Sequence, residues 1–104
     1  MSTRETIQQT LGTYYPKDGR VLLFGSRARG DASAGSDWDI LLLLNKDGRA
    51  TDEDFRQYAY PLVELGLKIN EQINPIIFTI PEWEHRSFTP FYHNVNDEAV
   101  ELCH

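Results

Sequence analysis

Residues 20–44 read RVLLFGSRARGDASAGSDWDILLLL and contain the features from which the fold and the chemistry can be predicted. An apolar run ends at Phe24, and a loop rich in Gly, Ala and Ser follows over residues 25–35. Two aspartates, Asp37 and Asp39, then open a second apolar run. Small turn residues let the backbone approach a phosphate closely, and two carboxylates can hold a metal ion beside that phosphate. The stretch therefore indicates a site for nucleotide chemistry.

Two strands are predicted on either side of this loop. The first spans Arg20 to Phe24, and the second spans residues 37–44. Because side chains alternate between the two faces of a strand, Asp37 and Asp39 share one face. Apart from these aspartates, both faces of the second strand are apolar, which predicts a central strand covered on both sides.

Two capping signatures predict helices. Ser2-x-x-Glu5 precedes an apolar stripe at helical spacing, and Pro16 ends that stripe. Thr51-x-x-Asp54 precedes a longer stripe that runs from Phe55 to Ile73. Pro61 lies inside the longer stripe and removes one backbone donor, which predicts a kink or a helix in two pieces. A single helical turn is also predicted at residues 26–29.

The C-terminal third completes the order of elements. A third strand is predicted over residues 75–80, and a helix begins at Pro81. Residues 87–94 are expected to be irregular, and Asn96 is expected to cap a final short helix that runs to Leu102. This order predicts an α+β or α/β-like fold, in which a small sheet is flanked by helices. With 104 residues and no internal repeat, we expect a single domain over residues 1–104.

Aromatic residues gather in this C-terminal third, at Trp83, Phe88, Phe91 and Tyr92. One interpretation is that they close the hydrophobic core. The other is that they form a surface for a partner, because exposed aromatic patches mark interfaces.

The composition narrows the class of protein. The formal net charge is −6, and acidic proteins bind DNA or RNA weakly because phosphate contacts depend on Lys and Arg. No apolar run approaches the roughly 18 residues that span a bilayer, and no signal-peptide pattern is present. The single cysteine, Cys103, cannot form an intramolecular disulfide. We therefore expect a cytoplasmic protein without membrane binding or strong nucleic-acid binding.

Asp37 and Asp39 are the leading candidates for metal ligands. Residues two apart on a strand point the same way, with Cα atoms roughly 6.6 Å apart. Two such carboxylates can share divalent cations, and nucleotidyl transfer commonly uses two metal ions about 3.5–4 Å apart. Mg²⁺ is expected because it prefers hard oxygen ligands, phosphate included. The alternative is a pair of solvated carboxylates at the start of a strand.

Gly25 and Ser26 are candidates for phosphate binding. A glycine permits close backbone approach, and the helical turn that follows offers free N–H groups. Ser26 adds a hydroxyl donor. Arg27 and Arg29 can neutralise phosphate charge, or they can be solvated loop arginines. For Gly25 and Ser26 the alternative is a plain strand-to-helix turn.

Together these features resemble the signature of the DNA polymerase beta-type nucleotidyltransferases, and most of all that of their minimal, MNT-type members. The similarity rests on Gly25-Ser26, Arg29-Gly30 and Ser36-Asp37-x-Asp39. The resemblance implies a mixed sheet with flanking helices. It also implies that Gly25 and Ser26 contact the triphosphate and that Asp37 and Asp39 bind Mg²⁺. Arg29 is a further candidate for a phosphate contact.

The same resemblance implies an activity and a partner. Family members transfer a nucleoside monophosphate, usually AMP from ATP, to an acceptor hydroxyl and release pyrophosphate. Minimal members often pair with a helical HEPN-type RNase as antitoxin to toxin, and some adenylylate that partner. A chain of 104 residues leaves little material for a separate acceptor domain, so we expect a protein acceptor.

One position departs from the family pattern. Active members place a third carboxylate on the strand after the second helix, and the best match here is Asn74. An amide cannot act as a general base and is a poorer Mg²⁺ ligand. Glu71 is either a substitute carboxylate or a helix-surface glutamate. The candidate functions are therefore an adenylylating enzyme, a weak or inactive antitoxin that neutralises its partner by occlusion, and a nucleotide sensor.

Overall fold

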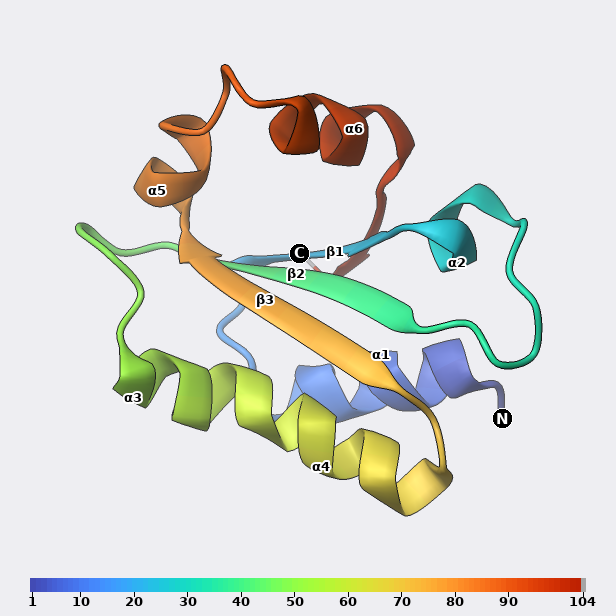
Figure 1. The fold of residues 1–104 in the computed structure, drawn as a ribbon. Helices are drawn as coiled ribbons and strands as arrows, with labels where there is room; N and C mark the ends of the chain where they lie inside the picture. The colour runs from blue at the N-terminus through green and yellow to red at the C-terminus, as the bar shows by residue number, and fades with distance from the viewer. Residues whose placement is uncertain (104) are drawn as a thin grey trace.

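The computed structural model describes residues 1–103, and its centre is a four-stranded sheet (Figure 1). The strands are β1 (Arg20–Phe24), β2 (Trp38–Leu44), β3 (Ile73–Thr79) and β4 (Val100–Cys103). They lie side by side in the order β3-β2-β1-β4. β2 pairs parallel with β3 and antiparallel with β1, and β1 pairs antiparallel with β4. The sheet is mixed, and the prediction of a small mixed sheet flanked by helices is confirmed.

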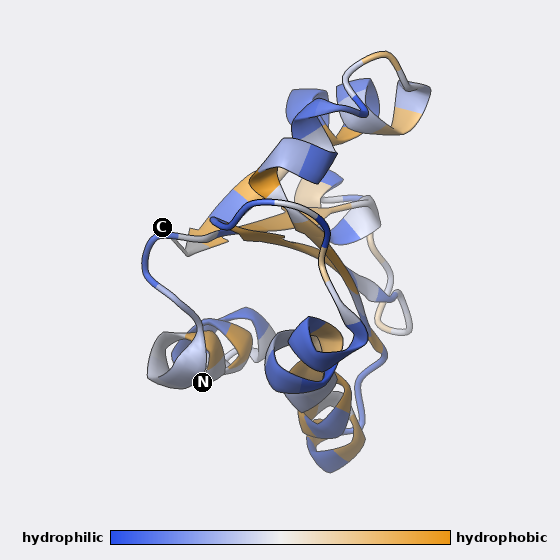
Figure 2. Ribbon diagram, turned by 90° about the vertical axis from the view of Figure 1, so that its left-hand side faces the viewer, coloured by the Kyte–Doolittle hydropathy of each residue, from blue (hydrophilic) through white to orange (hydrophobic). Residues whose placement is uncertain are grey.

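Helices cover both faces of the sheet. They are α1 (Thr3–Tyr14), α2 (Ser26–Arg29), α3 (Asp52–Asp54), the π-helical turn η1 (Phe55–Ala59), α4 (Tyr60–Ile69), α5 (Ile80–Glu84) and α6 (Pro90–Glu98). α1 and α4 pack on one face, and α5 and α6 lie over the other (Figure 1). Figure 2 shows the apolar strands between these two helical layers. No helix within residues 1–103 is long and apolar enough to cross a membrane.

Both capping boxes predicted from the sequence are present. At α1, the Glu5 amide donates to Ser2 Oγ and the Ser2 amide donates to Glu5 Oε1, each at 3.1 Å. At α3, Thr51 and Asp54 exchange the same pair of hydrogen bonds. The helix that follows is interrupted by η1, and Pro61 lies in the first turn of α4. The prediction of a helix in two pieces is therefore confirmed.

The junction between α4 and β3 differs from the sequence prediction. Apolar spacing extends the helix to Ile73, but α4 ends at Ile69. The C-cap residue Asn70 has a left-handed φ of 57°, and Ile73 begins β3. The third strand therefore spans residues 73–79, so it starts two residues before and ends one residue before the predicted bounds of 75 and 80. A Cβ atom on Gly66 would lie 2.6 Å from the Glu71 carbonyl oxygen, so the chain folds back closely over the end of α4. That reversal depends on a contact that helical periodicity does not report.

The C-terminal segment is a strand, and the predicted final helix from Asn96 to Leu102 is wrong. The predicted irregular stretch over residues 87–94 is also wrong in part, because Thr89 caps α6 by accepting from the Tyr92 amide at 3.2 Å. The helix ends at Glu98, and β4 then pairs with β1. The edge of β1 that faces away from β2 needs hydrogen-bond partners, and β4 supplies them. This pairing joins segments that are far apart in the sequence.

The aromatic residues of the C-terminal third divide between core and surface. Trp83 is 1% exposed, and its ring centroid lies 5.7 Å from that of Phe91 and 4.8 Å from that of Tyr92. These three side chains belong to the core cluster beneath α5 and α6. Phe88, in contrast, is 83% exposed. The core interpretation is confirmed for Trp83, Phe91 and Tyr92, and it is wrong for Phe88.

The buried carboxylate of Asp54 predicts how stability depends on acid. Lys46 Nζ lies 2.7 Å from Asp54 Oδ2, and this hydrogen bond, aided by those of Thr51, outweighs burial and holds the pKa of Asp54 below its ordinary value. A lowered folded-state pKa stabilises the protein above the unfolded value of about 3.9, and the stabilisation is lost as the pH falls through the folded value. We expect Asp54→Asn to make the free energy of unfolding depend less on pH in the acid range, as measured by denaturant titrations at several pH values. The exposed Asp47→Asn is the control, and equal slopes in both variants would contradict the assignment.

Candidate active site

The two aspartates lie at one end of the sheet, beside the loop that follows β1. The strand register places Phe24 opposite Asp39 and Asp39 opposite Asn74, so these residues form a row across the sheet. β2 begins at Trp38 and not at residue 37 as predicted, so Asp37 lies just outside the strand. Asp37 is exposed and Asp39 is half-buried. The row opens on the face that α5 and α6 cover farther along the strands.

Gly25 lies directly against the carboxylate of Asp39. A Cβ atom at this position would stand 2.5 Å from Asp39 Oδ2, and the glycine has a φ of 74°. The Gly25 carbonyl oxygen accepts from the amides of Ala28 and Arg29 at 3.0 and 3.1 Å, which closes the single turn of α2. Ser26 is the first residue of that turn. The Gly-Ser turn and the second aspartate, which the sequence treats as separate candidates, are therefore neighbours.

Asn74, which the sequence offers as the best match to a third carboxylate, donates a hydrogen bond to Asp37. Its Nδ2 lies 3.0 Å from Asp37 Oδ2, and its Oδ1 accepts from Gln72 Nε2 at 2.9 Å. A carboxylate only accepts hydrogen bonds, so the nitrogen of the amide must face Asp37. Asn74 could offer its oxygen to a metal only by turning its amide over and losing both bonds. Sequence reasoning missed Gln72, although its spacing of two residues from Asn74 on an extended segment is a usable signal.

Glu71 does not join the two aspartates. Its Oε2 accepts from the indole Nε1 of Trp38 at 3.3 Å, and its Oε1 accepts from Thr3 Oγ1 at 3.4 Å. Trp38 packs in the core cluster with α1 and α4, which lies on the opposite face of β2 from Asp39. Glu71 therefore anchors the N-terminus of α1 to the tryptophan and does not replace the missing carboxylate.

Arg27 ties α2 to the loop before β2. Its guanidinium donates to the carbonyl oxygens of Ser36 and Ala34 at 3.0 and 3.3 Å. The same group lies 4.5 Å from the centroid of the Trp38 ring. These contacts hold the loop that delivers Asp37 to the site.

Arg29 is held by two carboxylates. It forms ion pairs of 3.2 Å with Asp31 and with Glu98 of α6. Hydrogen bonds to Asp31, and then to Glu98, hold the pKa of Arg29 above its ordinary value. A phosphate contact by Arg29 would have to replace these partners. Glu98 is a participant that sequence reasoning missed, because no local pattern links residues 69 positions apart.

The donor set fits a hard divalent cation bound together with a nucleotide. Asp37 and Asp39 offer carboxylate oxygens, and Mg²⁺ is usually bound by one or two carboxylates plus the phosphates of the substrate. Residues 1–103 contain no cluster of three or more His, Cys, Asp or Glu side chains that could hold a metal. The close approach of Gly25 to Asp39 also places the turn that begins α2 directly beside one of these carboxylates.

Comparison with known proteins agrees with this geometry. The chain matches the family model of the nucleotidyltransferase domain over residues 4–92. It resembles a toxin-antitoxin crystal structure with AMP-PNP at 20% identity and a TM-score of 0.63, covering 97% of this chain and 73% of that one. A mutant of the toxin-antitoxin MntA-HpeT gives 18% identity, a TM-score of 0.62 and the same coverage. These identities show a shared fold, and no curated protein matches in sequence. Because the family model covers most of the chain, including both aspartates, this chain belongs to the nucleotidyltransferase domain family.

Proposed function

We propose that this chain transfers AMP from ATP to a hydroxyl group of a partner protein in a Mg²⁺-dependent reaction, as the antitoxin of a HEPN-type toxin. One observation carries the proposal: the backbone of Gly25 approaches the Asp39 carboxylate so closely that a Cβ atom would lie 2.5 Å from it. This contact joins the turn that would hold phosphate to the carboxylates that would hold the metal. A nucleotide with its metal needs both in one place.

Each residue of the site would have its own role in the transfer reaction. Asp37 and Asp39 would hold Mg²⁺, which neutralises phosphate charge and polarises the α-phosphate when it is bound. The acceptor oxygen bonds to the α-phosphorus, the bond from that phosphorus to the bridging oxygen breaks, and pyrophosphate leaves with the electron pair. The hydroxyl proton passes to an aspartate oxygen, because the amide of Asn74 cannot accept it. Gly25 and Ser26 hold the triphosphate, and Arg29 exchanges a carboxylate partner for phosphate.

The exposure of the site supports a protein acceptor. Asp37 is exposed, so an acceptor on the surface of another protein can approach the carboxylates directly. Both similar structures are toxin-antitoxin proteins, and one of them was crystallised with AMP-PNP. That combination supports a protein partner and an adenine nucleotide for this chain as well.

Transfer of label from ATP tests the proposal. The purified chain is incubated with a HEPN-type partner, Mg²⁺ and ATP labelled at the α-phosphate. We expect label on the partner, and we expect none with a chelator or with Asp39→Ala. The exposed turn residue Asp47 supplies the matched control, because Asp47→Ala should leave transfer unchanged. Labelling that persists in Asp39→Ala would overturn the assignment.

A second function, neutralisation of the partner by occlusion, is favoured by Asn74. Its hydrogen bond to Asp37 occupies the place of a third carboxylate, so the site holds two carboxylates where fully active members are expected to hold three. A double variant, Asp37→Asn with Asp39→Asn, separates the two functions. Protection against the partner that survives in this variant supports occlusion, and loss of protection with an intact complex supports the transfer reaction.

Substituting Asn74 with aspartate should make stability strongly dependent on Mg²⁺. Without metal, a new carboxylate beside Asp37 adds like-charge repulsion of about 1 kcal/mol in a water-exposed setting. With Mg²⁺, the same group is a third hard oxygen ligand, and we expect tighter metal binding. Thermal unfolding with and without Mg²⁺ measures the effect. Asn94→Asp on the exposed surface of α6 adds the same charge away from the site and should not respond to Mg²⁺.

A further inference from the structure

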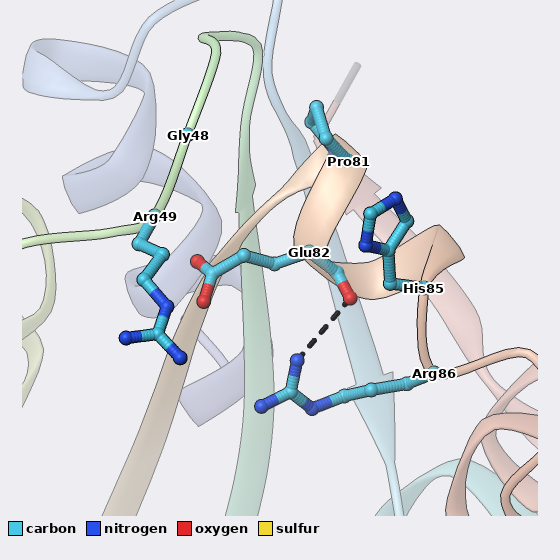
Figure 3. A pocket seen from close by; sticks show the side chains of 6 residues that line it. All are labelled: Gly48, Arg49, Pro81, Glu82, His85 and Arg86. Carbon is cyan, nitrogen blue, oxygen red and sulfur yellow. Dashed lines mark hydrogen bonds between the residues drawn. The ribbon is translucent and has the colours of Figure 1, made fainter.

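A second site lies at the opposite end of the sheet from the aspartates. A cavity of about 320 Å³ is lined by Gly48, Arg49, Pro81, Glu82, His85 and Arg86 (Figure 3). It forms where the chain leaves β2 and β3. The Leu44–Thr79 pair, at the far end of these strands, lies five positions along from the Asp39–Asn74 pair. At about 3.3 Å per residue this is roughly 17 Å, so the cavity is separate from the nucleotide site.

Glu82 supplies the single carboxylate that lines the cavity, and this carboxylate already accepts hydrogen bonds from two backbone amides. Glu82 Oε1 accepts from the amides of Ala50 and Thr79 at 2.7 and 3.1 Å. Burial raises the pKa of Glu82, but these amides and the guanidinium groups of Arg86 and Arg49 together bring it below its ordinary value. Glu82 is therefore an ionised structural group that links the segment after β2 to α5.

Among the described residues, the two arginines of the cavity use few of their N–H donors. Arg86 donates once, to the Glu82 carbonyl oxygen at 3.2 Å, and its guanidinium lies 4.2 Å from the centroid of the Phe78 ring. That contact orients the group toward the cavity (Figure 3). Within residues 1–103, neither Arg49 nor Arg86 belongs to any of the ion pairs, which involve Arg20, Arg29, Lys46 and Arg56. A guanidinium has five N–H donors, so a bidentate anion can still be bound.

We infer that this cavity binds a carboxylate of an acidic segment in a partner protein. Arg49 and Arg86 outweigh Glu82 by one positive charge, which suits a singly charged carboxylate better than a doubly charged phosphate. Nucleic acid is disfavoured because its affinity comes from several phosphate contacts to Lys and Arg, and the cavity offers only two arginines. Phe88, two residues beyond Arg86 in the chain, is 83% exposed and offers an apolar side chain to a partner. This inference does not depend on nucleotide transfer.

Titration with a short peptide tests the inference in the absence of any nucleotide. The probe is acetyl-Glu-Phe-Glu-Glu-amide, and its matched control is acetyl-Gln-Phe-Gln-Gln-amide. Chemical shifts of the arginine Nε–H groups report binding at the cavity. We expect the acidic peptide to bind and to shift the signals of Arg49 and Arg86, and we expect the neutral peptide to leave them unchanged. Inorganic phosphate at the same ionic strength should bind more weakly.

Substitutions of the cavity arginines test whether the peptide binds at the cavity. Arg49→Gln should weaken peptide binding roughly tenfold or more, as expected for loss of a charged hydrogen bond, and Arg49→Glu should abolish it. Within residues 1–103, Arg49 acts on the fold only through its charge near Glu82, so its variants remain informative where Arg86→Gln loses its stacking on Phe78. Arg56→Gln, an exposed arginine on the other side of the sheet, should bind like the unchanged protein. Equal binding by Arg49→Glu, or stronger binding of phosphate than of peptide, would overturn the inference.

Discussion

Mg²⁺ and ATP together are expected to raise the melting temperature of the unchanged protein, and the double substitution Asp37→Asn with Asp39→Asn is expected to abolish that rise. A ligand at a hundredfold excess over its dissociation constant stabilises the folded state by about 2.7 kcal/mol. In a domain of this size that corresponds to roughly 10–20 °C. Asparagine preserves the shape of both side chains and removes the charges that would hold the metal.

The fold should tolerate this double substitution, so loss of the shift can be assigned to the site. Asp37 is exposed, and an asparagine oxygen there can still accept from Asn74 Nδ2. The melting temperature without ligand should therefore change little. Asp52→Asn in the exposed first turn of α3 provides the charge control. A shift of equal size in the double variant would show that nucleotide binds elsewhere.

The second large effect is expected at Gly25. Alanine there would place a Cβ atom 2.5 Å from Asp39 Oδ2, at a φ of 74° and a ψ of −159°. This backbone region is essentially restricted to glycine and costs about 1–3 kcal/mol for another residue. The clash adds to this cost and displaces the carboxylate. Gly25→Ala should therefore lower the free energy of unfolding and also remove the response to Mg²⁺ and ATP.

A second glycine provides the matched control. Gly12 lies inside α1, and no atom stands within 4 Å of a Cβ built there. Gly12→Ala should stabilise the protein by up to about 1 kcal/mol, because alanine favours a helix over glycine. Chemical denaturation should thus give opposite signs for the two substitutions. A neutral Gly25→Ala would mean that the turn can move away from Asp39.

The local features of the chain were predictable because each depends on neighbouring residues. The capping boxes at Ser2 and Thr51, the strand from Arg20 to Phe24 and the turn at residues 26–29 are all present. Hydrogen bonds in a capping box span three residues, and a strand shows its period in a few side chains. The motif around Asp37 and Asp39 belongs to the same class, since its spacing places Asp39 in the first residues of β2 and Asp37 just before that strand.

Most of what the sequence did not predict depends on contacts between distant segments. The segment from Val100 to Cys103 forms a strand because it pairs with the free edge of β1, and no pattern within the segment itself indicates this pairing. Ile73 leaves the helix because the chain reverses over Gly66. Glu71 accepts a hydrogen bond from the Trp38 indole on the far face of the sheet. Arg29 donates to Glu98, which lies 69 positions away in the sequence.

The sequence by itself determined the family resemblance, the order of most elements and the identity of the two carboxylates, because residue type and short-range spacing are enough for these. Only the tertiary structure decided what those residues face. It placed Gly25 against Asp39 and turned the amide nitrogen of Asn74 toward Asp37. Such orientations depend on strand register and on hydrogen bonds between separate strands, and these arise only when the sheet is assembled.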